Sequence, residues 1–286
     1  MDALKRQITE KIKEIVDDSD KNNLHGFDEK SWEEPMVAFA SGSDPLFSFY
    51  KEHIGDFYWS PDEVMAIEYG KEFDISKLSI VCWILPQTEA TILDQRKETE
   101  LPSERWVYSR HYGEAFNQFL RAEVVSFIRG LGINAASALI TEGFGYQHSE
   151  KVGICSNWSE RHTAYAAGLG TFSLSDGFIT AKGKAHRVGS AIFEKIVEPD
   201  VRNNKSHTEN CLYYAKGTCG ACIKRCPADA ISKEGGHDKQ ACHDYIRATT
   251  MPYATKILGA EQTPCGLCQV KVPCERINPT ARTRTS

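Results

Sequence analysis

The sequence predicts an α+β protein with a cysteine-rich C-terminal module. Apolar segments with strand-like and helix-like periodicity alternate up to about residue 200, which is typical of a mixed body. The last part of the chain differs, because eight of the ten cysteines lie between Cys211 and Cys274. We place the boundary in the polar run 203–206, which gives a body over 1–204 and a module over 205–286.

The first half of the body combines helical and extended patterns. Apolar residues recur at helical spacing over 3–17, and the apolar runs 36–40 and 78–85 predict strands. Ser60, followed by a proline and then by Glu63, is typical of a helix start. We interpret the polar stretch 87–105 as an exposed connection.

The second half of the body contains the clearest helix. Aromatic and aliphatic residues repeat every three or four positions between Gly113 and Gly130, where Gly130-Leu131-Gly132 ends the pattern. The remaining predicted elements are a strand over 133–140, a loop over 143–146, a helix over 160–167, strands over 178–180 and 188–193, and a basic turn over 182–187.

The cysteine spacing indicates iron–sulfur clusters. Thr218 to Pro227 contains Cys-x2-Cys-x3-Cys-Pro, the end of a ferredoxin-type motif, and Cys265 and Cys268 form another Cys-x2-Cys pair. Eight cysteines suffice for two [4Fe–4S] clusters, and the cysteine before the proline ligates the other cluster in two-cluster ferredoxins. We therefore predict a first cysteine set, Cys211, Cys219, Cys222 and Cys274, and a second cysteine set, Cys226, Cys242, Cys265 and Cys268.

Two alternatives compete with this interpretation. Zinc at the 219/222 and 265/268 pairs leaves four cysteines and the Cys-Pro step unexplained. A disulfide framework is typical of short secreted chains. One departure from the ferredoxin motif is that Lys216 stands where the first cysteine is expected, so Cys211 substitutes from a longer loop.

Composition and missing motifs exclude several functions. A net charge of −5 and a pI of about 6.0 provide no basic field and disfavour a nucleic-acid partner. The N-terminal residues resemble no export signal, and the longest apolar run, 80–85, is too short to span a bilayer, so we expect a cytoplasmic protein without a membrane partner. No dinucleotide fingerprint, phosphate loop, zinc-peptidase helix or nucleophile elbow occurs in the sequence.

Longer stretches resemble the corrinoid-dependent iron–sulfur reductases, the family of reductive dehalogenases and epoxyqueuosine reductases. These stretches are 34–47, 104–106, 159–180 and the turn to Arg187, and 159–180 is most similar to soluble dehalogenase-like proteins. The resemblance implies a nitroreductase-like body, of the kind also found in cobalamin-trafficking proteins. It also implies a base-off cobalamin near one cluster, a low-potential donor such as ferredoxin or flavodoxin, and a small electrophilic substrate or a corrinoid.

The resemblance also implies site residues. Dehalogenases use a tyrosine proton donor beside a lysine or arginine, and our candidates are Tyr146 with Lys184 and Arg187 as catalytic residues. The candidates for corrinoid contact are Gly168, Leu169, Gly170, Thr171, Phe172, Ser173, Ser175 and Lys182. Epoxyqueuosine reductases carry a catalytic aspartate where this chain has Ile154 and Cys155, which disfavours queuosine chemistry.

Two functions follow as hypotheses. The first is a corrinoid-dependent reductase that passes electrons through two clusters to cobalt and then to a small electrophile such as an organohalide. The second is an iron–sulfur protein that transfers electrons, or that reduces or processes a corrinoid, without a dehalogenation substrate. The arginine- and threonine-rich tail 282–286 is expected to be disordered.

Overall fold

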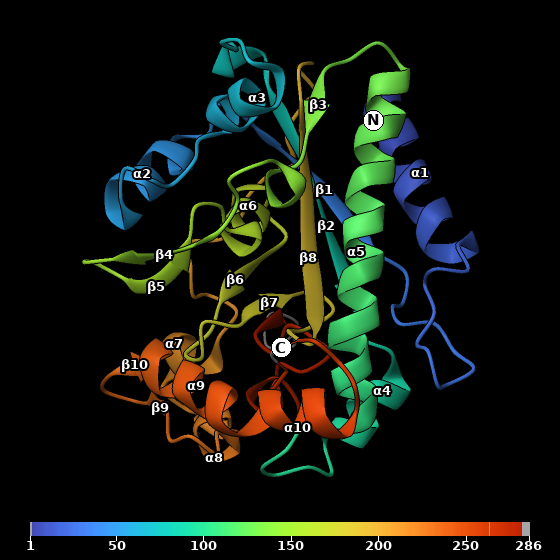
Figure 1. Ribbon diagram of the computed structural model, residues 1–286. Coiled ribbons are helices and arrows are strands. Elements are labelled where there is room, and N and C mark those ends of the chain that lie inside the picture. Colours follow the sequence, from blue (N-terminus) through green and yellow to red (C-terminus); the bar gives the residue numbers. More distant parts are fainter. Residues whose placement is uncertain (1, 263, 282–286) are drawn as a thin grey trace.

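A central antiparallel sheet organises the body. The computed structural model describes residues 2–262 and 264–281. Four strands pair in the order β1-β2-β8-β3, with β1 at Met36–Ser41, β2 at Ser79–Pro86, β3 at Ala135–Ala136 and β8 at His186–Phe193 (Figure 1). Every residue of β2 is buried, because helices cover both faces of the sheet. The expected mixture of helices and strands is therefore confirmed.

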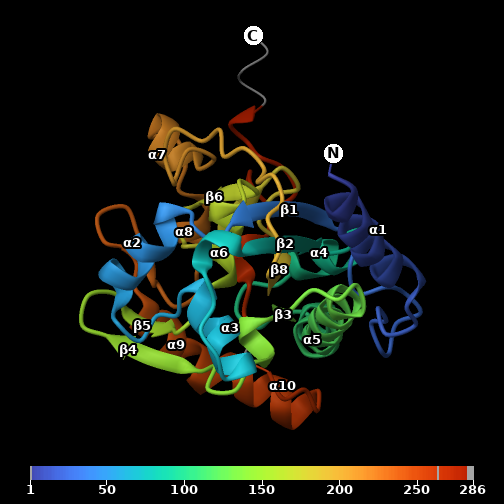
Figure 2. The ribbon, with the colours of Figure 1, turned by 90° about the horizontal axis from the view of Figure 1, so that it is seen from above.

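Side chains alternate between the two faces along β2. Val81, Trp83 and Leu85 pack with α1 (Ala3–Asp18) and α5 (Glu104–Gly130), which lie side by side in Figures 1 and 2. Ile80, Cys82 and Ile84 belong to the core cluster on the other face. The helices that contribute to this second cluster are α2 (Pro45–Ile54), α3 (Pro61–Tyr69) and α6 (Glu160–Ala166).

Two short hairpins lie beside the sheet. One pairs β4 (Tyr146–Ser149) with β5 (Gly153–Ser156), and the other pairs β6 (Gly170–Phe172) with β7 (Phe178–Thr180). The predicted loop over 143–146 therefore ends in a strand. The predicted strand over 133–140 is reduced to β3 and a 3-10 turn at Ala138–Ile140, and another 3-10 turn occupies Ile75–Lys77.

The cysteine-rich module contains short helices joined by irregular segments and lies below the body in Figure 1. Its α9 (Lys239–Tyr245) continues through a π-helical turn (Ile246–Thr250) into α10 (Met251–Ile257). The remaining elements are α7 (Leu212–Lys216), α8 (Ala221–Arg225), the pair β9 (Ile231–Ser232) and β10 (Gly236–His237), and a 3-10 turn at Leu267–Gln269.

The module packs tightly against the body. Gly183 faces the backbone of the module so closely that an added Cβ would lie 2.3 Å from the Glu275 carbonyl oxygen. Gly266 approaches the Trp106 ring in the same way, with 2.2 Å between the added Cβ and the ring. The boundary near 204 stays a prediction, while these contacts show that the segments on its two sides share an interface.

The prediction of an exposed connection over 87–105 is wrong. Residues Glu89–Gln95 form helix α4, and α5 begins at Glu104, capped by Ser103, nine residues before the predicted start. Gln95 is fully buried. Both ends of its side-chain amide are paired there, since Nε2 donates to the Cys265 carbonyl oxygen at 2.7 Å and Oε1 accepts from the Ser103 amide at 2.7 Å. Helix α2 was also not predicted, although Asp44 caps it and Pro45 opens it. The tail 282–286 lies outside the described residues.

Candidate iron–sulfur site

The two cysteine sets line two separate cavities. Cys211, Cys219, Cys222 and Cys274 stand in the wall of a small cavity within the module. The second set, Cys226, Cys242, Cys265 and Cys268, stands in the wall of a larger cavity of about 250 Å³, whose other wall belongs to the body. The structure thus groups the cysteines as their spacing suggests, and their roles as cluster ligands stay a prediction.

Short local elements position the thiols. Cys211 caps α7, Cys222 lies in α8, and Cys226 caps the end of α8. Cys242 lies on α9, while Cys265 and Cys268 flank Gly266, whose φ of +65° is accessible to glycine without strain. Segments far apart in sequence are thereby brought around each cavity.

The pKa values of the thiols reflect the same grouping. Burial, together with the smaller effects of Cys211, Cys222 and Cys219, raises the pKa of Cys274 to about 11, against the opposing effect of Lys184. Burial and the other three thiols of the second set together raise the pKa of Cys265 to about 12. Since thiolates are the ligands of iron, cluster assembly in these cavities must release protons.

The number and type of the donors are those that two four-iron clusters require, while the cavity of the first set, at about 20 Å³, is much smaller than that of the second. Within the described residues, no three His, Cys, Asp or Glu side chains converge on a point where one metal ion could bind. A [4Fe–4S] cluster does not need such convergence, because each thiolate binds a different iron. Four thiols around each cavity, with the buried cation Lys184 between the sets, match the requirement for a negatively charged cluster in each.

The wall of the larger cavity opposite the cysteines is cationic. Arg110, Arg161 and Arg187 line it together with His186 and Gln87. Burial, with a smaller effect of the neighbouring Arg110, lowers the pKa of Arg187 to about 9. The body therefore places positive charge in the wall of the larger cavity, where it can act on a ligand bound beside the second cysteine set.

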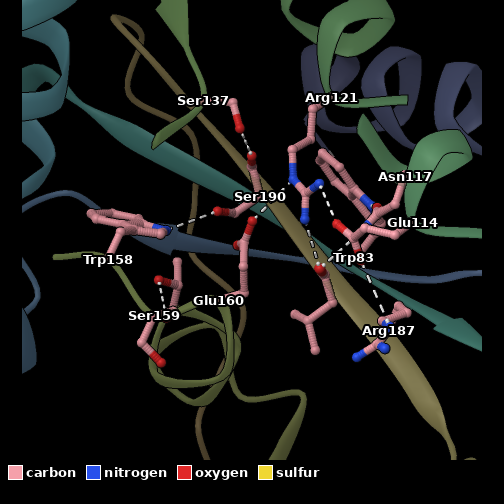
Figure 3. A network of polar contacts seen from close by, with 12 residues as sticks. Trp83, Glu114, Asn117, Arg121, Ser137, Trp158, Ser159, Glu160, Arg187 and Ser190 are labelled. Carbon is pink, nitrogen blue, oxygen red and sulfur yellow. Dashed lines mark hydrogen bonds and ion pairs between the residues drawn. The ribbon is translucent and has the colours of Figure 1, made fainter. Parts of the chain in front are cut away.

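A buried polar network supports this wall from behind (Figure 3). Arg121 lies between two carboxylates: its Nη1 is 3.1 Å from Glu114 Oε1 and its Nε is 3.2 Å from Glu160 Oε1. Glu114 also approaches Arg187, with 3.7 Å between Arg187 Nε and Glu114 Oε2. Burial raises the pKa of Glu114, but Arg121, Arg110 and Arg187 outweigh this and lower it overall. The network therefore links the arginine wall to the interior of the sheet.

The predicted catalytic residues separate. Tyr146 opens β4 with 78% of its surface exposed, and its hydroxyl is close enough to Arg187 to act on the pKa of that guanidinium. Lys184 is instead buried beside the cysteines, where its Nζ donates to Ser175 Oγ at 3.0 Å. Of the two predicted cationic partners, Arg187 therefore interacts electrostatically with Tyr146, whereas Lys184 lies among the cysteines.

Most of the residues predicted to contact a corrinoid instead contact other parts of the protein. Gly168 has a φ of +76°, and an added Cβ would lie 3.0 Å from the Val201 carbonyl oxygen. An added Cβ at Gly170 would lie 2.3 Å from the Ile179 carbonyl oxygen. Both glycines therefore permit close contact with protein backbone.

The other predicted contacts also have protein partners. Thr171 Oγ1 accepts from the Asn210 amide at 2.9 Å, and the half-buried Lys182 donates to the Glu34 carbonyl oxygen at 2.8 Å. Leu169 and Phe172 pack in the body core. Ser173 and Ser175 do face the cavities of the first and second set, respectively.

A whole corrinoid does not fit the larger cavity in this conformation. Sites for drug-sized ligands have volumes of about 300–1,000 Å³. A corrinoid exceeds a drug-sized molecule, whereas the cavity measures about 250 Å³. We therefore derive no step through cobalt.

Several residues of the larger cavity were not predicted. Trp106 and Arg161 lie within the stretches that resemble the reductases, so that resemblance was a usable signal for them. Gln87 and Arg110 belong to segments without a motif. Gln87 directly follows β2, and Arg110 reaches the cavity because α5 begins earlier than its periodicity indicates.

Comparison with known proteins shows the fold. No family model and no curated protein matches the chain. Among solved structures, a selenomethionine-labelled epoxyqueuosine reductase matches at 18% identity and a TM-score of 0.51, over 95% of this chain and 65% of that one. The catabolic reductive dehalogenase NpRdhA matches at 18% identity and a TM-score of 0.51, over 87% of this chain and 31% of that one.

A further match is an epoxyqueuosine reductase with an epoxyqueuosine-modified tRNA-Tyr stem loop, at 18% identity and a TM-score of 0.47. This chain spans about two thirds of the reductase and one third of the dehalogenase. Both names are those expected from the sequence, so the resemblance is confirmed at the level of the fold. None of the described helices is both long and apolar enough to cross a membrane.

Proposed function

We propose that this protein is an iron–sulfur reductase with two [4Fe–4S] clusters, one on each cysteine set. The observation that carries this proposal is the pair of cavities, each with four cysteines in its wall, of which the larger is shared with the body. The fold shared with an epoxyqueuosine reductase and a reductive dehalogenase supports the oxidoreductase class.

The bound clusters would supply single-electron transfer from an external low-potential donor, such as ferredoxin or flavodoxin, to the larger cavity. Arg110 and Arg187 would orient a small electrophile there, because they line the wall opposite the second set. Tyr146, near Arg187, would supply a proton from its hydroxyl. Reduction of a carbon–halogen bond takes two electrons and one proton and releases halide, so the donor must act twice.

The proposal also includes cobalamin as a cofactor bound by this chain. The fold shared with NpRdhA and the sequence resemblance favour a corrinoid, while the volume of about 250 Å³ opposes it in this conformation. A protein that only transfers electrons, or reduces a corrinoid held by a partner, is the second candidate, favoured by that small volume. Binding of free cobalamin separates the two.

A nucleic-acid substrate re-enters as a candidate. The acidic pI disfavoured a nucleic-acid partner. Epoxyqueuosine is a modified nucleoside, however, and the match to an epoxyqueuosine reductase goes against that expectation. Ile154 and Cys155, where the epoxyqueuosine enzymes carry an aspartate, lie in strand β5. Without a carboxylate there, a small electrophile remains the first substrate class.

The test is anaerobic purification, cluster reconstitution and iron analysis, followed by gel filtration with hydroxocobalamin. We expect about eight irons per chain, four for each set. A co-eluting base-off corrinoid spectrum would assign cobalamin to this chain and lead to a screen of halogenated aromatics with titanium(III) citrate. About eight irons without corrinoid would leave the electron-transfer candidate, and zinc in place of iron would refute the proposal.

A further inference from the structure

Lys184 places its side chain between the two cysteine sets. Only 2% of the residue is exposed, and it lines the small cavity together with all four cysteines of the first set. Its backbone amide donates to the Cys274 carbonyl oxygen at 2.9 Å, which fixes its position relative to that set. The Cδ atom packs near Gly177, where an added Cβ would lie 3.2 Å away.

Ser175 connects this lysine to the second set. Lys184 Nζ donates to Ser175 Oγ at 3.0 Å, and Ser175 lines the larger cavity. Lys184 also interacts electrostatically with Cys268, and Ser175 forms a separate hydrogen bond with Cys268. One ammonium group therefore acts on both sets, and Ser175 provides an additional link to the second.

Among the described residues, no Asp or Glu forms an ion pair with the Lys184 ammonium. The sulfur atoms of Cys274, Cys268, Cys222 and Cys211 interact electrostatically with it. A buried charge without a partner costs several kcal/mol, so its counter-charge must come from the sulfur side.

We propose that Lys184 sets the reduction potentials of both clusters by placing one buried positive charge between them. The inference rests on the proposed function, since it requires a cluster on each cysteine set. Reduction of a [4Fe–4S] cluster adds one electron and breaks no bond, so a nearby cation stabilises the reduced form more than the oxidised one. Lys184 thereby raises both potentials and favours acceptance of an electron from the donor.

The experiment is a redox titration of the reconstituted chain, monitored by electron paramagnetic resonance, with iron content measured on each sample. Lys184→Met removes the charge and keeps an unbranched side chain. Lys184→Arg keeps the charge. The matched control is Lys216→Met, which removes an exposed lysine from the end of α7, between Cys211 and Cys219, where water screens the charge.

We expect Lys184→Met to move both midpoint potentials to more negative values, while Lys184→Arg and Lys216→Met stay close to the wild type. Unchanged potentials in Lys184→Met at full iron content would overturn the inference and leave the proposed function standing. A wild-type chain that binds no iron would instead overturn both.

A second variant covers the case in which Lys184→Met assembles no clusters. Ser175→Ala removes the link to Cys268 and keeps the ammonium, so we expect the potential of the second cluster to change more than that of the first. Equal potentials in Ser175→Ala and the wild type would then refute the role of the Lys184–Ser175 pair.

Discussion

Arg121 and Glu160 form an ion pair in the interior of the body, with 3.2 Å between Arg121 Nε and Glu160 Oε1. The Arg121 side chain is 1% exposed and that of Glu160 is 10% exposed. The pair joins α5 to α6 behind the arginine wall, and Arg121 also holds Glu114, the carboxylate nearest Arg187 (Figure 3). The cationic wall of the larger cavity thus depends on a charge network that is itself buried.

Arg121→Met should strongly destabilise the protein. The substitution leaves Glu114 and Glu160 buried without their shared cation, which costs about 3–5 kcal/mol in free energy of unfolding. Denaturant titration measures the loss. Lys11→Met is the control, because Lys11 and Glu14 form an exposed pair worth about 0–1 kcal/mol. Similar losses in both variants would contradict the network's role.

Gly183→Ala should loosen the contact between the body and the module. Both Gly183 and Gly132 have a positive φ, +80° and +78°, so alanine is strained to a similar extent at each. Only at Gly183 would the new Cβ collide with backbone, 2.3 Å from the Glu275 oxygen, whereas nothing lies within 4 Å at Gly132. We expect Gly183→Ala to lose more stability by about 1–3 kcal/mol and to retain less iron.

The stability of the protein should fall in mild acid. Burial lowers the pKa of His186 to about 4, and its Nε2 donates to the Phe178 carbonyl oxygen at 2.7 Å. Between that value and about 6.5, the unfolded chain binds more protons at this histidine than the folded chain does, so acid favours unfolding. The loss from pH 7 to pH 5.5 amounts to about 1 kcal/mol for this residue.

Denaturant titration of His186→Gln at both pH values checks this origin. The glutamine amide can still donate a hydrogen bond but does not titrate, so the difference between the two pH values should shrink by about 1 kcal/mol. The neutral His162, whose pKa burial lowers to about 3, should act in the same direction, whereas Glu160, whose pKa burial raises, should act in the opposite direction. If the difference in free energy of unfolding between the two pH values is the same in His186→Gln and the wild type, His186 is protonated in the folded protein at pH 5.5.

Single serine substitutions should remove one cluster each. Cys242→Ser takes a ligand from the second set and Cys274→Ser from the first, so each variant should keep about four irons. Cys82→Ala is the control, because Cys82 lies in the core on β2, away from both cavities, and should keep about eight irons. Loss of all iron in both serine variants, with the fold intact, would contradict two independent sites.

Short-range patterns were sufficient for much of the architecture. Apolar runs identified β1, β2 and β8, helical periodicity identified α1 and most of α5, and cysteine spacing separated two sets that line two cavities. These features depend on neighbours along the chain, which a sequence displays directly. Helix α4 was missed because buried polar side chains such as Gln95 look like surface residues until their backbone partners are known.

Long-range packing assigned the remaining roles. Lys182 and Lys184 belong to one basic turn in the sequence, yet Lys182 lies at the surface and Lys184 lies between the cysteine sets. The two lysines differ in burial because Gly183 has no side chain, so the module backbone around Glu275 packs against one side of the turn. Gly168 likewise was expected to face a macrocycle and instead faces the backbone of Val201. The sequence shows directly that a residue is cationic or small. The role of that residue depends on which distant segment folding brings into contact with it.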